Sequence, residues 1–303
     1  MHGSAAGILR ADAGTVRVKH IQDREYIVKS IRLHMRLVGI AAAVSCSTVL
    51  PLRVMADVDA NAPMSTGIDK GLVNITTPAI LAPREMALGV DVRVFGDKEN
   101  ATYFGPSLRI GASPNWEFGV NSALAQFKRY TTSAGTTISY GGTDVELTAK
   151  YATRQSGKYA LSYQFGLGMP HTPSQVSPVM TAGIAGSYSP CSYLDLYINP
   201  RTSLITDNAI VGLGVGAKLK LAKGFSLIGD YTAIIGGANT IALSTGTPRS
   251  HDVYGAALRY TPGKGQFSID LGYSNGIGST TGASLTPGLG NDGAFYLSLN
   301  MRR

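Results

Sequence analysis

The sequence predicts an all-β protein, a transmembrane antiparallel up-and-down β-barrel of about twelve strands. First, apolar and polar residues alternate over segments of about ten residues, whereas strands of soluble proteins usually have about five or six. Second, short connections alternate with longer ones along the chain. Third, no run of eighteen or more uncharged apolar residues lies outside an N-terminal leader, which excludes a bundle of membrane helices. Together these features favour strands that cross a membrane.

The first element in chain order is an export signal. Residues 35–56 read MRLVGIAAAVSCSTVLPLRVMA, in which the basic Arg36 precedes an apolar core. Val54 and Ala56 then provide small residues at the positions that a signal peptidase reads. This order is typical of a secretory signal peptide and predicts cleavage between Ala56 and Asp57.

The residues upstream of this signal are charged and have no apolar core. We interpret residues 1–34 as an upstream extension and expect translation to start at Met35. A buried N-terminal helix is an alternative interpretation of the apolar segment. A lipoprotein signal ending at Cys46 is another, but the apolar stretch continues past that cysteine instead of turning polar.

The charge of the chain is concentrated in the leader. Residues 1–56 hold eight Lys/Arg and three Asp/Glu, whereas residues 57–303 hold nineteen and sixteen. The region after the leader therefore carries no basic cluster of the kind that binds nucleic acid. It keeps a single cysteine, Cys191, so an internal disulfide framework is excluded.

Residues 57–84 are irregular and contain three prolines, and we expect them to act as a tether or a plug ahead of a barrel spanning residues 85–303. In the first strand, Met86, Leu88 and Val90 share one face, while Asp91 and Arg93 share the other. The same pattern predicts strands at 86–95, 103–112, 116–126, 142–152, 157–168, 178–188, 191–200, 208–221, 224–234, 250–261, 265–274 and 292–301.

The connections between these strands alternate in length, and an even strand count returns both chain ends to one side. Barrels of the bacterial outer membrane have short periplasmic turns and long outer loops. We expect short turns at 113–115, 154–157, 189–190, 222–223 and 261–264. We expect long loops at 96–102, 127–141, 169–177, 201–207, 235–249 and 275–291.

This organisation resembles that of bacterial outer-membrane β-barrel proteins, including porins, over residues 85–303. The last strand, Phe295 to Met301, alternates as theirs does, but the chain ends on Arg302 and Arg303 where that class commonly has an aromatic residue. The resemblance implies export to the outer membrane of a Gram-negative bacterium. It also implies contact with outer-membrane lipid and with the outer-membrane assembly machinery.

Aromatic residues of the apolar face gather at the two ends of the predicted strands. Such bands are the interfacial girdles expected of a membrane barrel, so we expect the apolar face to meet lipid. The short-turn band comprises Trp116, Tyr151, Tyr159, Tyr188, Phe225, Tyr260 and Phe267, and the long-loop band comprises Phe104, Tyr254, Tyr273 and Phe295.

The opposite face is polar and rich in glycine, and we expect it to line the lumen. Twelve strands enclose more space than side chains fill, since about eight is the size of a filled barrel. The charged residues expected in the lumen are Asp91, Arg93, Arg109, Glu117, Asp144, Glu146, Lys150, Asp195, Lys218, Lys220, Asp230, Arg259 and Asp270.

No motif predicts catalysis, a cofactor or a metal site. Residues 272–276 match the nucleophile-elbow pattern around Ser274, but no histidine follows it in the chain. His171 and His251 are isolated residues in or beside predicted loops, whereas a metal site needs several converging ligands. We therefore interpret the chain as a porin-like passive channel for small hydrophilic solutes. A structural or loop-binding barrel and a hydrolase barrel remain alternatives.

Overall fold

The computed structural model describes residues 71–96, 101–125, 128–131, 135, 137–140, 142–156, 158–170, 178–205, 208–242, 244–263, 265–288 and 291–303. The extension 1–34, the signal 35–56 with its cleavage site at Ala56 and Asp57, residues 57–70 and His171 lie outside the described residues.

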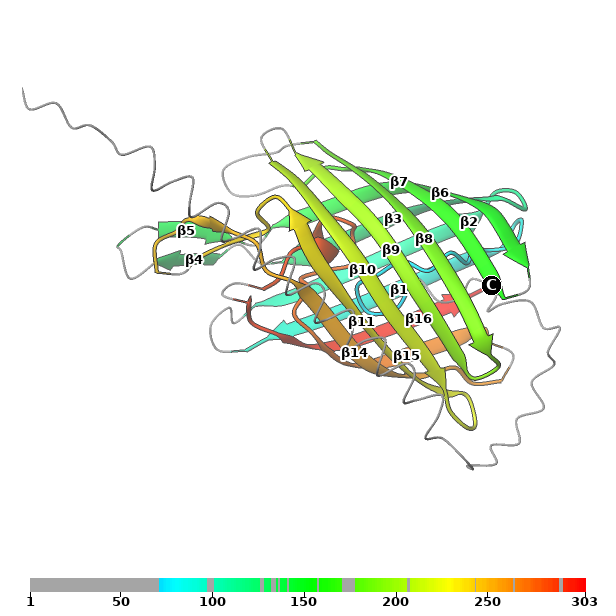
Figure 1. Cartoon of the computed structure of the whole chain (residues 1–303). Coiled ribbons are helices and arrows are strands. Elements are labelled where there is room, and N and C mark those ends of the chain that lie inside the picture. The colour runs from blue at the N-terminus through cyan, green and yellow to red at the C-terminus, as the bar shows by residue number, and fades with distance from the viewer. Residues whose placement is uncertain are drawn as a thin grey trace, which may run out of the picture. The chain divides into compact units, whose positions relative to one another are not determined.

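The described chain forms a closed antiparallel barrel of twelve strands, which confirms the predicted fold (Figure 1). Each strand pairs with its neighbours in the barrel, and β1 closes the barrel against β16. The barrel strands are β1 (Met86–Phe95), β2 (Thr102–Gly111), β3 (Trp116–Ala125), β6 (Thr143–Ser156), β7 (Tyr159–Gly168), β8 (Val179–Cys191), β9 (Leu194–Ile205), β10 (Asn208–Lys220), β11 (Phe225–Gly236), β14 (Val253–Tyr260), β15 (Phe267–Ser274) and β16 (Ala294–Arg302).

The alternation of the sequence becomes an alternation of exposure along each strand. In β14, every second residue from Val253 is buried and the residues between are exposed. Most exposed positions of the barrel strands are apolar, whereas most of the charged strand residues are buried. Membrane barrels have this arrangement, because side chains facing lipid must be apolar and those facing the lumen need not be.

Several connections differ from the expected ones. The prediction of a long loop at 201–207 is wrong, because β9 continues to Ile205 and β10 begins at Asn208. The turn expected at 189–190 moves to residues 192–193 because β8 continues to Cys191. Two expected loops contain small hairpins of their own: β4 (Lys128–Thr131) with β5 (Thr137–Tyr140), and β12 (Thr240–Ile241) with β13 (Pro248–Arg249).

Two segments occupy the interior of the barrel. We call residues 71–82 the plug segment and residues 275–288, between β15 and β16, the inner loop. Leu72, Val73 and Ile75 of the plug segment are buried against the inner face of the wall. The expectation that 275–291 forms an outer loop is wrong for residues 275–288, since the short 3-10 helix η1 (Ala283–Leu285) and its neighbours are buried. None of the described helices is long and apolar enough to span a membrane.

Candidate functional site: a filled polar bore

The expected aromatic residues lie on the outer face in rows that cross neighbouring strands. At the short-turn end, Trp116 lies opposite Tyr151 with ring centroids 4.9 Å apart. The same end carries two more such pairs, Tyr159 with Tyr188 and Phe225 with Tyr260, at 4.9 and 4.7 Å. Tyr273 lies opposite Phe295 at the long-loop end. The other expected members are exposed or partly exposed: Phe104, Tyr254 and Phe267.

The structure places most of the expected lumen charges in buried positions. Asp144 and Lys220 are partly buried, and Lys220 forms an ion pair with Asp195 at 3.1 Å near the short-turn end. The buried set comprises Asp91, Arg93, Arg109, Glu117, Glu146, Lys150, Asp195, Lys218, Asp230, Arg259 and Asp270. A charge buried without partners costs several kcal/mol, so the contacts of these groups matter.

Asp230, on β11, receives the tip of the plug segment. One of its carboxylate oxygens accepts hydrogen bonds from the backbone N–H groups of Val73 and Asn74, both at 2.7 Å. The other oxygen accepts from Nδ2 of Asn74 at 2.9 Å. The plug segment therefore supplies donors to a buried carboxylate that lies more than 150 residues away in the chain.

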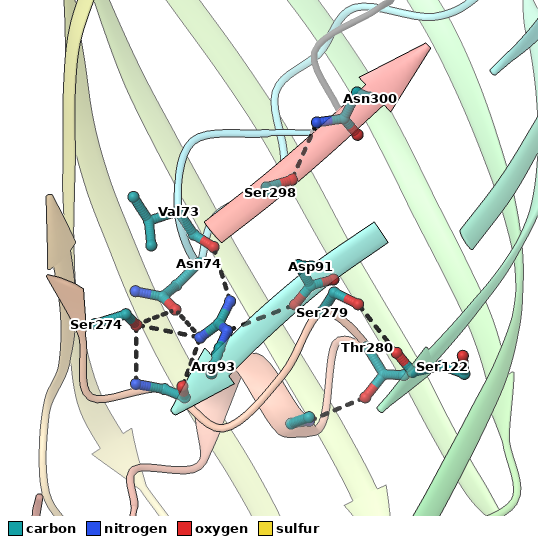
Figure 2. A network of polar contacts seen from close by, with 12 residues as sticks. Val73, Asn74, Asp91, Arg93, Ser122, Ser274, Ser279, Thr280, Ser298 and Asn300 are labelled. Atoms are coloured by element: carbon teal, nitrogen blue, oxygen red, sulfur yellow. Dashed lines mark hydrogen bonds and ion pairs between the residues drawn. The ribbon is translucent and has the colours of Figure 1, made fainter. Parts of the chain in front are cut away.

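Arg93, on β1, lies at the centre of the polar network (Figure 2). Its guanidinium donates to the side-chain oxygen of Asn74 at 2.9 Å and to the carbonyl of Val73 at 3.1 Å. It also donates to the hydroxyl of Ser274 at 3.1 Å and to the carbonyl of Gly276 in the inner loop at 2.5 Å. One wall residue thus holds both internal segments.

Two further arginines of the wall bind carbonyl groups of the plug segment. Arg259 forms a two-pronged contact with Asp270, at 2.7 and 2.6 Å, and donates to the carbonyl of Gly71 at 3.0 Å. Arg201, on β9, donates to the carbonyl of Asn74, and to the carbonyl of Ser284 in the inner loop at 3.2 Å. Guanidinium groups suit this role because their fixed fork of donors reaches several acceptors at once.

Arg201 was missed by the sequence analysis because it fell in an expected loop. The sequence did contain a sign of this role. Asp195, Asn199, Arg201 and Ser203 are polar and fall at alternate positions, so they lie on the same face of the strand. Pro200 is the last residue of the expected strand 191–200, and proline cannot donate to a sheet ladder. The structure keeps the strand intact there: Nδ2 of Asn199 donates to the carbonyl of Ile184 on β8 at 2.8 Å.

The rest of the plug segment is held in the same way. Oδ1 of Asn199 accepts from the backbone N–H of Thr76 at 3.3 Å. Lys150 donates to the carbonyl of Ala79 at 2.7 Å, and Glu117 accepts from the N–H of Leu81 at 2.9 Å. All three contacts join a wall side chain to a backbone atom of the plug segment.

Three glycines of β10, Gly212, Gly214 and Gly216, face the bore, and we call them the glycine stripe of β10. They leave space for the plug segment and the inner loop. A Cβ atom at Gly216 would lie 2.3 Å from a methyl carbon of Leu72, and one at Gly214 would lie 2.7 Å from a methyl carbon of Ile75. Such distances are too short for real contacts, so a side chain larger than glycine at either position would require the side chain of Leu72 or Ile75 to move or to be smaller. Gly214 and Gly216, on the glycine-rich face expected to line the lumen, thus form part of the surface on which the plug segment packs.

The inner loop also contacts carboxylates of β6. Thr280 donates its hydroxyl to Asp144, and the backbone N–H of Thr281 donates to Glu146 at 2.8 Å. Together the plug segment and the inner loop fill the middle of the bore. A polar cavity of about 60 Å³ remains between them and the wall, which is room for very few water molecules.

Ser274 of the nucleophile-elbow pattern and the isolated His251 both make structural hydrogen bonds. The Ser274 hydroxyl donates to Asn74 at 2.9 Å and accepts from Arg93. His251 bonds to the side chain of Asn239 through its own backbone N–H and carbonyl groups. Among the described residues, no group of three or more His, Cys, Asp or Glu side chains is placed to hold a metal ion.

Comparison with solved structures finds β-barrels of the bacterial outer membrane. No protein-family model matches the sequence, and no curated protein matches it. The chain is similar in structure to the KdgM porin, with 8% identity over 72% of this chain and 98% of the porin, and a TM-score of 0.47. It is also similar to the COG4313 outer membrane channel of Pseudomonas putida F1, with 12% identity, 74% and 96% coverage and a TM-score of 0.48. LpxR from Salmonella typhimurium matches at 11% identity, 72% and 99% coverage and a TM-score of 0.42. At these identities the likeness concerns the fold alone.

Proposed function

We propose that the chain is an outer-membrane channel for small hydrophilic solutes, whose bore is closed at rest by the plug segment. The observation that carries this proposal is the kind of contact that holds the plug segment. The wall supplies charged or amide side chains, and the plug segment supplies mainly backbone N–H and carbonyl groups. Water can replace a backbone group in each such contact, so departure of the plug segment would leave a hydrated, charged wall.

The apolar outer surface and the sequence of the leader support a setting for this channel in the outer membrane. We propose that the apolar outer face contacts the lipid of a Gram-negative outer membrane, between the two rows of aromatic residues. Export would use the signal at 35–56, with cleavage before Asp57, and the outer-membrane assembly machinery would insert the barrel. The plug segment would then enter the bore from the short-turn end, where β1 begins.

We propose a transport role and no catalytic one. Ser274, the candidate nucleophile of the sequence motif, is held between Arg93 and Asn74 in the polar network. A nucleophile needs an adjacent base instead of a guanidinium that only donates. Selectivity would come from the inner charges, which act strongly in a confined bore.

A structural or loop-binding barrel is the second candidate, and the filled bore is the observation that favours it. In that case the plug segment and inner loop would serve as a permanent core. The two candidates differ in one respect, namely whether the plug segment ever leaves.

Asn74→Ala is the variant that tests the proposal with the smallest change. It removes the side chain that donates to Asp230 and accepts from Arg93 and Ser274. Hydrogen bonds to charged groups contribute about 1.5–3 kcal/mol each, so losing even one should raise the open fraction by about tenfold. The measurement is the current carried by the refolded protein in planar bilayers.

Thr76→Ala is the matched control in the same segment. Thr76 contacts Asn199 through its backbone N–H, which alanine keeps, so the open fraction should stay at the wild-type value. An unchanged current in Asn74→Ala, or an equal rise in both folded variants, would contradict plug control of the bore and favour the structural barrel.

A further inference from the structure

A second cavity lies at the long-loop end of the barrel, apart from the polar network. It has a volume of about 190 Å³ and is bounded by the inner face of the wall and by the inner loop. Its lining is mostly apolar. The apolar residues that line it include Ala123, Val179, Ile205, Ile210, Ile277 and Ala283.

One polar atom of this lining has no partner. The side chain of Ser203, on β9, is 1% exposed, and its hydroxyl makes no hydrogen bond within the part of the chain that the structure describes. Leaving such a group unsatisfied destabilises the protein. A ligand that supplies a hydrogen-bonding group at this point would satisfy it.

A carboxylate lies near the unpartnered hydroxyl. Asp144 also lines the cavity, and one of its oxygens accepts from Thr280 of the inner loop. A Cβ atom at Gly282 would lie 3.4 Å from Oγ of Ser203 and 3.8 Å from Oδ2 of Asp144. The two polar groups therefore converge over the α-carbon of Gly282, at one side of an otherwise apolar cavity.

We propose that this cavity binds a small uncharged amphipathic molecule, a single ring that carries a hydroxyl group. The size fits, because an engineered apolar cavity of about 150 Å³ holds benzene. The ring would lie against the apolar residues, where burial of apolar area is favourable. The hydroxyl would accept from Ser203 and donate to Asp144. The site is built by the wall and the inner loop, so it does not depend on departure of the plug segment.

The ligand probe is 4-fluorophenol, and the readout is its ¹⁹F chemical shift during titration of the refolded full-length protein in detergent. The matched probe is 4-fluorotoluene, which has nearly the same size but no hydroxyl group. We expect a saturable shift with 4-fluorophenol and weaker binding of 4-fluorotoluene. Identical binding of the two probes, or a shift that does not saturate, would overturn the proposal.

Two variants test whether the probe binds in this cavity. Ser203→Ala should weaken binding of 4-fluorophenol by about fivefold, the effect of one neutral hydrogen bond, and leave 4-fluorotoluene unchanged. Gly282→Ala adds a methyl group between the two polar atoms and should weaken both probes. Its backbone, with φ −63° and ψ −49°, accepts alanine without strain.

Folding is checked separately from binding. Ser203→Ala removes an unsatisfied buried group and should be at least as stable to heat as the wild type. Wild-type affinity in a folded Gly282→Ala variant would place the probe in the detergent or elsewhere on the protein, and would overturn the assignment of this cavity.

Discussion

Leu147→Arg is expected to lower the yield of membrane-inserted barrel by at least about tenfold. Leu147 is 58% exposed and lies on the outer face of β6, opposite Val120 of β3 and Leu167 of β7. An arginine facing lipid near the middle of the membrane costs about 2–4 kcal/mol, and each 1.4 kcal/mol is a factor of ten. The yield is measured as the heat-modifiable folded band after refolding into lipid vesicles.

The depth of Leu147 follows from the aromatic row on the same strand. Leu147 is four residues from Tyr151, which corresponds to about 13 Å along a strand. With a strand tilt of about 40°, it lies about 10 Å deeper than the row, close to the middle of an apolar band about 25 Å tall.

Leu221→Arg is the control with the same chemistry at a different depth. Leu221 is exposed and follows the end of β10, at the short-turn end where the cost falls to about 0–1 kcal/mol. It should fold nearly as well as the wild type. Equal yields for the two variants would contradict the assignment of the outer face to lipid.

Deletion of residues 71–82 is expected to convert a silent barrel into one with discrete channel openings. The barrel should still close, because β1 pairs with both β2 and β16 through residues that the deletion leaves in place. The buried groups that lose the plug segment, such as Asp230 and Arg259, would be hydrated by the water that enters. The readouts are single-channel current and the swelling of vesicles in small sugars.

The inner loop remains in this deletion, so the opening should be narrow. The heat-modifiable band establishes that the variant is folded before its current is recorded. A folded deletion variant that neither conducts nor lets sugars pass would contradict the channel and support the structural barrel.

The sequence predicted the wall of the barrel because lipid and lumen impose opposite chemistry on alternate residues. That rule is local and reaches every strand, so all twelve barrel strands could be found from period and connection length. It failed at β9, which continues past Pro200 to Ile205, and Nδ2 of Asn199 donates to the carbonyl of Ile184 beside that proline. Arg201 was lost from the expected lumen set for that reason.

The contents of the bore could be predicted only in outline. Twelve strands leave space, and residues 57–84 were available to enter it, but no local pattern pairs Asn74 with Asp230 or Arg93. The length of segment 275–291 predicts a long loop, but length does not determine whether a loop folds outward or into the bore. The glycine stripe of β10 indicates that another segment packs closely against this strand, but it does not identify the plug segment as that segment.

The central claim is that the plug segment controls the bore, and a reversible lock tests it most directly. A Cβ atom at position 214 would lie 2.7 Å from a methyl carbon of Ile75, so cysteines at 75 and 214 fall near the Cβ separation of about 3.5–4.5 Å that a disulfide needs. The lock combines Ile75→Cys and Gly214→Cys with Cys191→Ser. The last change removes Cys191, the free cysteine among the residues that the structure describes. Asn74→Ala is added so that the unlocked state conducts.

The measurement is the current through one population of locked barrels before and after a reductant is added. The predicted result is a silent bilayer under oxidising conditions and channel openings after reduction, with either single-cysteine variant insensitive to the reductant. A current that is the same before and after reduction, with the disulfide shown to form and to break, would contradict plug control of the bore.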